Sequence, residues 1–239
     1  DCNLSPVVKI AIVVFIFPLT IILPKEYNIV KGGIPMVKRL YHGSTHMIEK
    51  PIFGYGKSYN DYGLGFYCTD NLDMAKEWGA SQDQSGYANC YDLDCHDLQI
   101  LNLNGDEYCI LNWLAVLLEN REFDVPSGLA LEAKEYILKN FAVPYKRYDA
   151  IIGYRADDSH FSFAQDFING TISYRQLGNA MHLGKLGQQF VLKSEKAFQA
   201  IHYVGCEVSD ASEWYEKKML RDKCARREYF SVERNRRQR

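Results

Sequence analysis

Short segments of apolar or alternating residues, separated by polar turns, occupy the first part of the chain and return near its end. A short apolar or alternating run bounded by glycine, proline, asparagine or aspartate is typical of a β-strand. Asn104 and Gly105 form such a boundary, because both residue types favour tight turns. The pattern predicts strands at 37–42, 65–69, 87–94, 98–103, 148–154, 188–193 and 200–208.

The middle of the chain follows a helical period instead. The apolar residues there recur at the spacing that places side chains on one face of a helix. They are Ile110, Trp113, Leu114, Leu117 and Leu118. The order of elements, with strands first, helices inserted after them and strands again at the end, differs from the strict alternation of strands and helices in a doubly wound sheet. We therefore expect an α+β fold class.

Capping residues predict further helices. Asp70 or Asn71 can cap a helix that ends at Trp78. Within it, Leu72, Ala75 and Trp78 are spaced to face a core. A serine at 127 predicts a second helix up to 140, which the proline at 144 prevents from continuing. Helical patterns also cover 162–168, 173–181 and the tail at 212–239.

Residues 1–35 differ in character from the rest of the chain. The run at 7–23 is nearly all apolar, which fits a short membrane span or a secretory signal without a clear cleavage site. A third interpretation, which we favour, is translation of upstream DNA, because residues 31–33 can be encoded by a purine-rich string that resembles a bacterial ribosome-binding site. The protein would then start at Met36 and be cytoplasmic, without stable membrane association. If residues 1–35 are native, a membrane anchor is expected.

The domain boundaries follow from these patterns. We expect an N-terminal segment at 1–35, one domain at 36–208 and a basic helical tail at 209–239. The chain of 239 residues is 47% hydrophobic with a formal net charge of −2, which suits one sizeable core and argues against a protein that coats nucleic acid. The arginines that end the tail indicate either a solvated helix or a contact for an acidic partner or RNA.

The seven cysteines fit a reducing compartment, since their number is odd and no two of them form a CxxC pair. Cys90, Cys95 and His96 lie close enough together to suggest a metal. No second ligand pair stands at zinc-type spacing, so we predict no metal site. Cys68 has no assignable His–Asp partner and is interpreted as a small buried residue.

Two neighbouring motifs carry the candidate chemistry. Residues 40–44 (LYHGS) place His42 at the end of one predicted strand, and residues 61–69 (DYGLGFYCT) place Tyr67 on the next. Glycines stand where a backbone must lie close to something. This layout indicates a pocket for a flat, amide-bearing ligand. Asp61 fits a loop cap or a contact to a ribose, and we favour the cap.

Three ordered runs resemble the motifs of the ADP-ribosyltransferase superfamily: 40–44, 65–69 and 188–193. The similar clade has His, Tyr and Glu, with Asp or Gln in variants, and includes diphtheria toxin and the poly(ADP-ribose) polymerases. Residues 148–159 (YDAIIGYRADDS) and the run around Gln189 resemble a bacterial family known only as a domain of unknown function, which its motifs place in this superfamily. The resemblance covers about 38–203 and implies a split β-sheet core with inserted helices.

The resemblance also implies roles for individual residues, with NAD as substrate. The catalytic residues would be His42, Tyr67 and Gln189. In this assignment His42 binds a ribose hydroxyl, the backbone of Gly43 binds the nicotinamide amide, and the Tyr67 ring stacks on the nicotinamide. The cofactor site would be completed by Ser44, Gly65 and Asp61. Arg155, Asp157 and Asp158 follow a buried strand and are candidates for acceptor binding or for a structural ion-pair turn.

The third motif departs from the most active pattern. Gln189 stands where active members often have Glu, and an amide gives less help to a cationic sugar than a carboxylate does. The resemblance therefore implies transfer of single ADP-ribose units to a protein or nucleic-acid acceptor. The alternatives are a silent NAD- or partner-binding module and an NAD glycohydrolase. Free-standing bacterial domains of this kind often resemble toxins, which implies a small antitoxin protein as partner.

Overall fold

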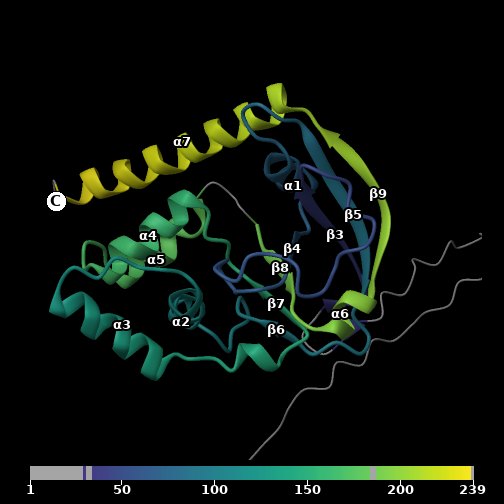
Figure 1. The fold of residues 1–239 in the computed structure, drawn as a ribbon. Helices are drawn as coiled ribbons and strands as arrows, with labels where there is room; N and C mark the ends of the chain where they lie inside the picture. Colours follow the sequence, from purple (N-terminus) through teal and green to yellow (C-terminus); the bar gives the residue numbers. More distant parts are fainter. Residues whose placement is uncertain (1–28, 31–33, 184–186, 238–239) are drawn as a thin grey trace, which may run out of the picture.

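A seven-stranded mixed sheet forms the centre of the computed structural model, which describes residues 29–30, 34–183 and 187–237 (Figure 1). Its strands are β3 Val37–Ser44, β4 Phe66–Thr69, β5 Gly86–Asp94, β6 Ile100–Asn102, β7 Ala150–Gly153, β8 Gln189–Leu192 and β9 Ile201–Ser209. In space the order is β6-β7-β8-β4-β3-β5-β9. The β6–β7 pair is parallel and the other neighbours are antiparallel. A separate hairpin joins β1 Ile29–Val30 to β2 Ile34–Pro35.

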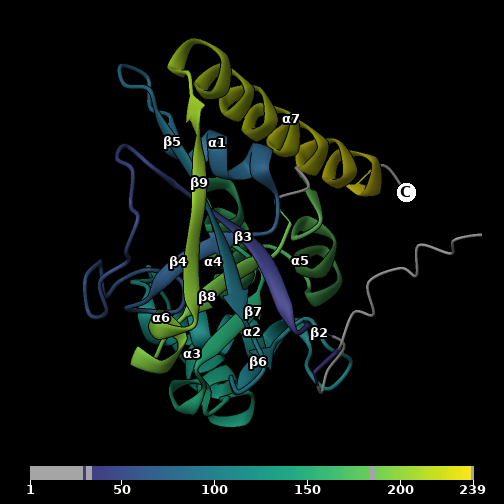
Figure 2. The ribbon, with the colours of Figure 1, turned by 90° about the vertical axis from the view of Figure 1, so that its right-hand side faces the viewer.

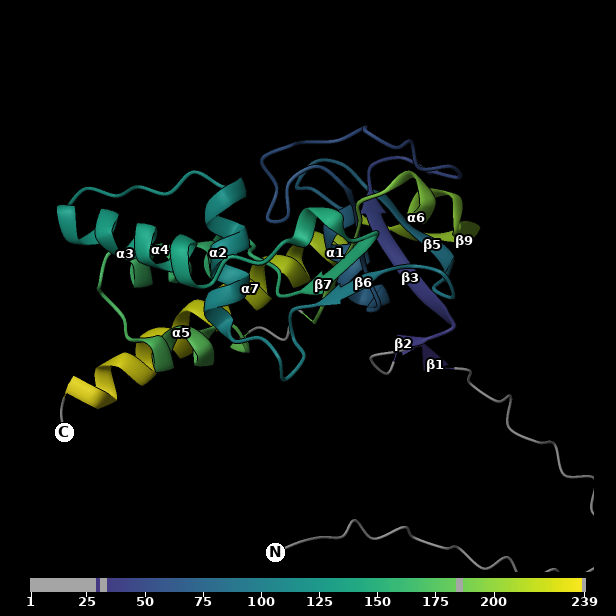
Figure 3. The same cartoon turned by 90° about the horizontal axis from the view of Figure 1, so that it is seen from below.

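Seven helices accompany the sheet in the described part of the chain, which confirms the predicted α+β class. They are α1 Leu72–Gly79, α2 Ile110–Asn120, α3 Gly128–Asn140, α4 Asp158–Ile168, α5 Tyr174–Ala180, α6 Glu195–Gln199 and α7 Ala211–Arg237. Helices α2 to α5 gather at one side of the sheet, and α1 lies near β3 and β5 (Figure 1). The long α7 runs past α1 and α4 along one side of the molecule (Figures 2 and 3).

Strands β7 and β8 are buried on both faces. Ile151 and Val191 belong to the hydrophobic cluster around α2 to α5, whereas Ile152, Phe190 and Leu192 belong to the cluster on the opposite face. Strands covered on both sides have no solvent face to hold polar side chains, so they read as continuous apolar runs. This explains why their apolar runs have no alternation.

The strongest local signals are confirmed. All five apolar residues that predict the central helix are buried in α2. Ser127 caps α3, and its side chain accepts a hydrogen bond from the Ala130 amide at 3.1 Å. Asn71, one of the two predicted caps, starts α1 by accepting from Met74. Each of these signals depends on neighbours within a few residues, so tertiary packing has little power to override it.

Other details differ from the sequence prediction. The expected core face of α1 is correct for Ala75 but wrong for Leu72 and Trp78, which are only partly buried, because α1 packs between the sheet and α7. Helix α4 begins earlier than predicted, because Asp157 caps it and accepts from the His160 amide at 3.1 Å. The short α6 and the β1–β2 hairpin were not predicted.

The C-terminal tail forms α7, but it is more than a solvated helix. Trp214, Ala225 and Tyr229 are buried on its inner face, and the Tyr229 ring stacks on Phe163 at 4.2 Å between centroids. Arg221 pairs with Glu77 of α1 at 2.8 Å. The arginines near the end lie where side chains are not described, so a contact with an acidic partner or RNA stays a prediction.

Within the described residues, no helix combines the length and apolar character that a membrane span requires. The apolar run at 7–23 lies outside those residues. The alternatives for the N-terminal segment therefore stay predictions.

Candidate functional site

One cavity of about 480 Å³ gathers eight of the ten candidate residues. It lies where β3 separates from β4. Among the described residues, β3 pairs with β5 along its whole length but with β4 through Tyr41 and Thr69 alone. The eight residues are His42, Gly43, Ser44, Asp61, Gly65, Tyr67, Arg155 and Gln189. Residues far apart in the sequence thus meet at one break in the sheet.

His42 is held in one orientation and one tautomer. Its ring packs against Phe66 at 4.4 Å between centroids, and its Nδ1 lies 2.6 Å from the Tyr67 carbonyl oxygen. Because a carbonyl only accepts, Nδ1 carries the proton and donates. Burial lowers the pKa of His42, although the bond to Tyr67 opposes this, so the ring is neutral at pH 7. Its Nε2 is then an acceptor, which the described residues leave without a partner.

The Tyr67 ring is fixed through its hydroxyl group. The hydroxyl donates to the Gly63 carbonyl and accepts from the Tyr62 amide at 3.1 Å. Gly63 adopts a φ of 73°, a left-handed conformation that favours glycine, and a Cβ there would also displace the Asn120 side chain. Lys193 Nζ donates to the carbonyls of Tyr62, at 2.5 Å, and of the residue after Gly63. Since the loop holds the oxygen, the ring of Tyr67 can line the cavity in a fixed position.

Gln189 is a buried amide with an unused acceptor. It opens β8, lies opposite Thr69 and Gly153 in the two neighbouring strands, and is 6% exposed. Its Oε1 is buried and has no hydrogen-bond partner among the described residues. A buried acceptor without a partner costs stability, so such groups in native structures usually serve a ligand or an ordered water. Gln189 is therefore placed to receive a hydrogen bond from a bound molecule.

Gly43 is required for a reason other than the one the sequence suggested. A Cβ on this residue would lie 2.1 Å from the Ala75 carbonyl oxygen and 2.6 Å from the Gly79 nitrogen. The backbone of α1 thus occupies the space that a side chain would need. The main chain of Gly43 still lines the cavity. Close packing of helix on strand, and not approach of a ligand, excludes every larger residue here.

Asp61 fastens one wall of the cavity. It is 5% exposed, and it accepts from Arg121 Nη1 at 2.8 Å and from the Ala156 amide at 2.9 Å. The expected capping of its own loop is wrong, since Asp61 ties the loop to α2 and to the segment after β7. Tyr62 reinforces the tie by donating to the Tyr154 carbonyl at 2.6 Å. The carboxylate of Asp61 is thus fully engaged within the protein.

The segment after β7 divides into a cavity residue and a structural one. The guanidinium of Arg155 lies 3.7 Å from the centre of the Trp78 ring and lines the cavity. Asp157 lies outside the cavity, where it caps α4 and accepts from His160 Nδ1 at 2.7 Å and Arg221 Nη1 at 3.2 Å. The ion-pair interpretation is therefore correct for Asp157. The side chain of Asp158 is not among those described.

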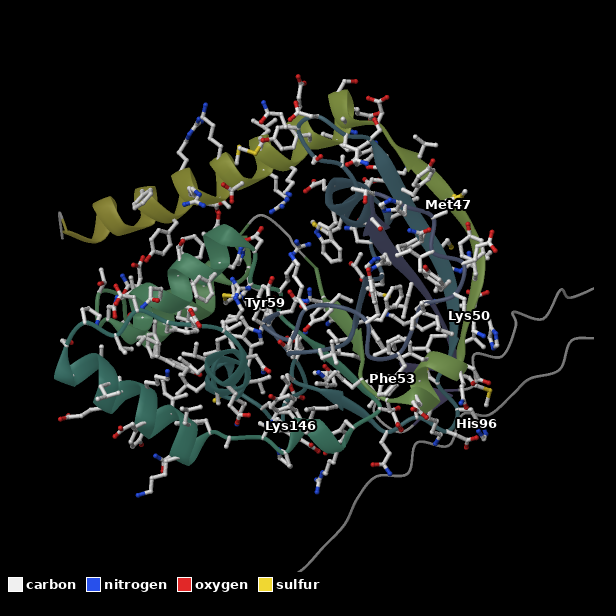
Figure 4. The ribbon with its side chains drawn as sticks, in the orientation of Figure 1. Met47, Lys50, Phe53, Tyr59, His96 and Lys146 are labelled. Atoms are coloured by element: carbon white, nitrogen blue, oxygen red, sulfur yellow. The ribbon has the colours of Figure 1, made fainter. Side chains whose placement is uncertain are left out.

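The loop between β3 and β4 forms the mouth of the cavity and exposes several aromatic side chains. Tyr55 is 80% exposed. Phe53 and Tyr59, which are labelled in Figure 4, are also exposed. Tyr55, with Lys57 two residues further on, lines the cavity. The exposure of residues 52–59 at the mouth leaves this loop accessible to a large molecule.

Arg121 and Trp78 are among the cavity residues that the sequence analysis did not identify as site residues. Arg121 directly follows an apolar helix, and its partner Asp61 lies sixty positions earlier, so no local signal joins them. Trp78 was assigned to a core face, because a tryptophan at helical spacing is usually core. The side of α1 on which it lies depends on α7, which is distant in the sequence.

None of the cysteines in the described part of the chain lines the cavity. Burial raises the pKa of the Cys68 thiol well above its usual range, which agrees with its interpretation as a small buried residue. No cluster of three or more histidines, cysteines or carboxylates suited to a metal ion occurs within the described ranges.

Comparison with known proteins gives one match. A family model described as a protein of unknown function, DUF3990, matches residues 38–203. No curated protein and no solved structure matches the chain.

Proposed function

We propose that this chain, which belongs to the DUF3990 family, is an NAD-dependent mono-ADP-ribosyltransferase. Its sheet would be the split sheet of the ADP-ribosyltransferase superfamily. The observation that carries the proposal is the meeting of His42, Tyr67 and Gln189 in one cavity. They come from three strands and present, beside one fixed aromatic ring, two acceptors that have no partner among the described residues. The sheet separates at the cavity, since β3 and β4 pair there through Tyr41 and Thr69 alone among the described residues.

The site residues suit the recognition of a nicotinamide riboside. The ring of Tyr67 offers an apolar face to the nicotinamide, and the main chain of Gly43 lies beside it for the carboxamide. Ribose hydroxyls are donors, and the Nε2 of His42 and the Oε1 of Gln189 are acceptors. Binding would therefore satisfy both of these acceptors, for which the described residues provide no partner.

The reaction transfers the ADP-ribosyl group at C1′ of the nicotinamide ribose. The bond from C1′ to the ring nitrogen breaks, and nicotinamide leaves neutral with the electron pair. The sugar passes through an oxocarbenium-like state, which nearby negative charge or oriented dipoles stabilise. A hydroxyl, carboxylate or amine of the acceptor then bonds to C1′, and any proton it carried passes to the solvent. Water in place of the acceptor would make the protein an NAD glycohydrolase.

One observation favours a second candidate, an NAD-binding module without turnover. No free carboxylate faces the reacting sugar in the described cavity. Gln189 is an amide, and the carboxylate of Asp61 is committed to Arg121 and to the Ala156 amide. Electrostatic support for a cationic transition state is therefore limited to dipoles.

Labelled NAD distinguishes these candidates. The full chain is incubated with NAD labelled in the adenylate part, with and without a bacterial lysate. Label on macromolecules supports transfer, whereas free ADP-ribose alone supports the glycohydrolase. Retained NAD binding with neither product supports the silent module and contradicts the proposed transfer.

A matched pair of histidine variants ties the activity to the cavity. His42→Ala is expected to lower transfer about a hundredfold, because it removes an oriented contact to the sugar. His46→Ala is the control, since this exposed histidine lies outside the cavity. Equal transfer by the two variants, with unchanged thermal melting, would show that the site is elsewhere.

A further inference from the structure

Arg155 occupies an unusual position for a partly buried cation. It follows the end of β7 by two residues, and its side chain crosses to α1, where the guanidinium lies 3.7 Å from the centre of the Trp78 ring. Its Nη1 is buried and has no hydrogen-bond partner among the described residues. An arginine stacked on an aromatic face keeps its edge of N–H donors available for a planar or tetrahedral anion.

The described carboxylates that act on the charge of Arg155 are already occupied. Asp61 accepts from Arg121 and the Ala156 amide, and Glu77 accepts from Arg221 at 2.8 Å. Asp157, two residues from Arg155, accepts from His160 and from the same Arg221. Within the described part of the chain, Arg155 therefore forms no ion pair. The protein brings three carboxylates close to this cation and directs each of them to another donor.

The charge of Arg155 is retained despite its burial. Removal from water disfavours the charged form and lowers its pKa to about 10, while the nearby carboxylates oppose the change. The guanidinium is thus still protonated at neutral pH. Lys57 and Arg121 line the same cavity, so its cationic side chains outnumber its one carboxylate, Asp61. A cavity with this excess of positive charge favours an anionic ligand.

Arg155 also stands at a defined place relative to the other site residues. Gly153 at the end of β7 pairs with Gln189, so Arg155 leaves the sheet directly beside that amide. Trp78, on which Arg155 rests, lies so close to Gly43 that a Cβ on the glycine would be 2.6 Å from the tryptophan Cβ. The stacked pair therefore adjoins Gln189 and Gly43, two of the residues assigned to the nicotinamide riboside. In NAD, the diphosphate is attached to that same ribose through its 5′ carbon.

We propose that Arg155, seated on Trp78, is the subsite for the diphosphate of the dinucleotide, a proposal that rests on NAD as the substrate. Arg155 then belongs to the NAD side of the cavity and not to acceptor recognition. Its donors bind the phosphate oxygens bidentately, and the bound anion supplies a charge partner that the described side chains do not provide.

Calorimetric titration of the full chain with NAD, ADP-ribose and nicotinamide tests this assignment. Arg155→Gln is expected to weaken NAD and ADP-ribose binding by about tenfold to a hundredfold, the range for a lost hydrogen bond to a charged group, and to leave nicotinamide binding unchanged. Arg155→Lys keeps the charge but loses the planar fork, so its affinity for NAD and ADP-ribose should lie between those of the wild type and Arg155→Gln. Arg147→Gln is the matched control, because this exposed arginine also lies over an aromatic ring, that of Tyr148, but outside the cavity.

Each outcome separates the subsite from the proposed reaction. Loss of NAD and ADP-ribose affinity with normal nicotinamide affinity supports the subsite. Equal weakening of all three ligands, or no weakening, overturns it. If Arg155→Gln weakens the binding of an oligonucleotide, titrated in the same way, but not the binding of NAD, the arginine recognises an acceptor and the assignment is wrong. If the wild type binds ADP-ribose through Arg155 but neither binds nor cleaves NAD, the subsite stands and the proposed function fails. If it binds none of the ligands, both fail.

Discussion

The cavity has two walls of different construction. His42, Tyr67 and Gln189 form a wall that comes from strands, carries no charge at neutral pH and leaves two acceptors without partners among the described residues. Arg121 and Arg155 belong to a wall that comes from helix ends and loops and carries three of the cavity's charged groups, with Asp61 as the third. The strand wall is held by ladder hydrogen bonds, and the charged wall is held by contacts between side chains distant in the sequence.

This difference matches the two halves of the proposed substrate. A ring and a sugar need shape and hydrogen-bond acceptors, which a neutral wall built on strands can offer without paying for a buried charge. A diphosphate needs cations, which the other wall keeps available by pairing its carboxylates elsewhere. This construction predicts that substitutions in the neutral wall change the stability of the fold or the rate of the reaction. Substitutions behind the charged wall should change stability through lost ion pairs, and therefore in a pH-dependent way.

The largest expected effect concerns the backbone of the neutral wall. Gly43→Ala places a Cβ 2.1 Å from the Ala75 carbonyl oxygen. The clash is with main-chain atoms, so it can be relieved only if α1 shifts relative to β3. We expect the free energy of unfolding to fall by about 3 kcal/mol, the upper range for overpacking. Urea denaturation measures it. Gly128→Ala is the control, since nothing lies within 4 Å of a Cβ there, and it should be neutral or slightly stabilising. Similar values for the two variants would show that α1 does not confine Gly43.

The next effect tests the ion pairs behind the charged wall. Asp157→Asn leaves the fully buried His160 without its carboxylate, and we expect a loss of about 2 kcal/mol at neutral pH. Asp70→Asn, which removes a more exposed pair with Lys38, should cost less than about 1 kcal/mol. Chemical denaturation of both variants gives the comparison. Equal losses would contradict the structural role of Asp157.

The same variant should alter the acid limb of the stability curve. Burial alone would raise the pKa of Asp157, but the hydrogen bond and charge of His160, together with Arg155, bring it well below its usual value. A lowered pKa in the folded state favours the ionised form. Its contribution is complete above the unfolded value of about 4 and is lost as pH falls below it. Between pH 5 and about 3, Asp157→Asn should therefore lose less stability than the wild type; parallel curves would contradict this.

The smallest expected effect introduces a charge into the neutral wall. Gln189→Glu would place a carboxylate beside the cationic sugar, and we expect nicotinamide release in a single turnover to rise about tenfold, or about 1.4 kcal/mol in barrier. The exposed neighbour provides the control, Gln188→Glu, which should leave the rate unchanged. A folded Gln189→Glu protein that releases nicotinamide no faster than the wild type would remove Gln189 from the reacting centre.

Local patterns predicted the fold well where neighbours in the sequence decide the conformation. Helix α2 follows its apolar period, and α3 begins after its serine cap, as expected. The early start of α4 was not predicted, although the sequence contains a signal for it. That signal is Asp157, which stands at capping distance before His160. The buried face of α1 could not be predicted, since it depends on α7, which meets α1 through contacts such as Arg221 with Glu77.

The sequence predicted which residues form the candidate site better than it predicted the role of each residue. Eight of the ten residues line one cavity, but Asp61 fastens the wall with Arg121 and Gly43 accommodates a helix. Neither duty leaves a mark in the nearby sequence. The choice of donor for each carboxylate depends on which side chains the fold brings within about 3 Å, and residues of several segments compete for it.

By itself, the amino-acid sequence determined the order of strands and helices and the residue types at the three motifs, because hydrophobic period, caps and turns act over a few residues. Only the tertiary structure decided that the motifs meet where β3 leaves β4 and that the missing side chain of Gly43 makes room for α1. It also decided that Arg155 lies on Trp78 without a carboxylate partner among the described side chains. These outcomes depend on close packing and on competition for buried charge, which act between residues that only the complete fold brings together.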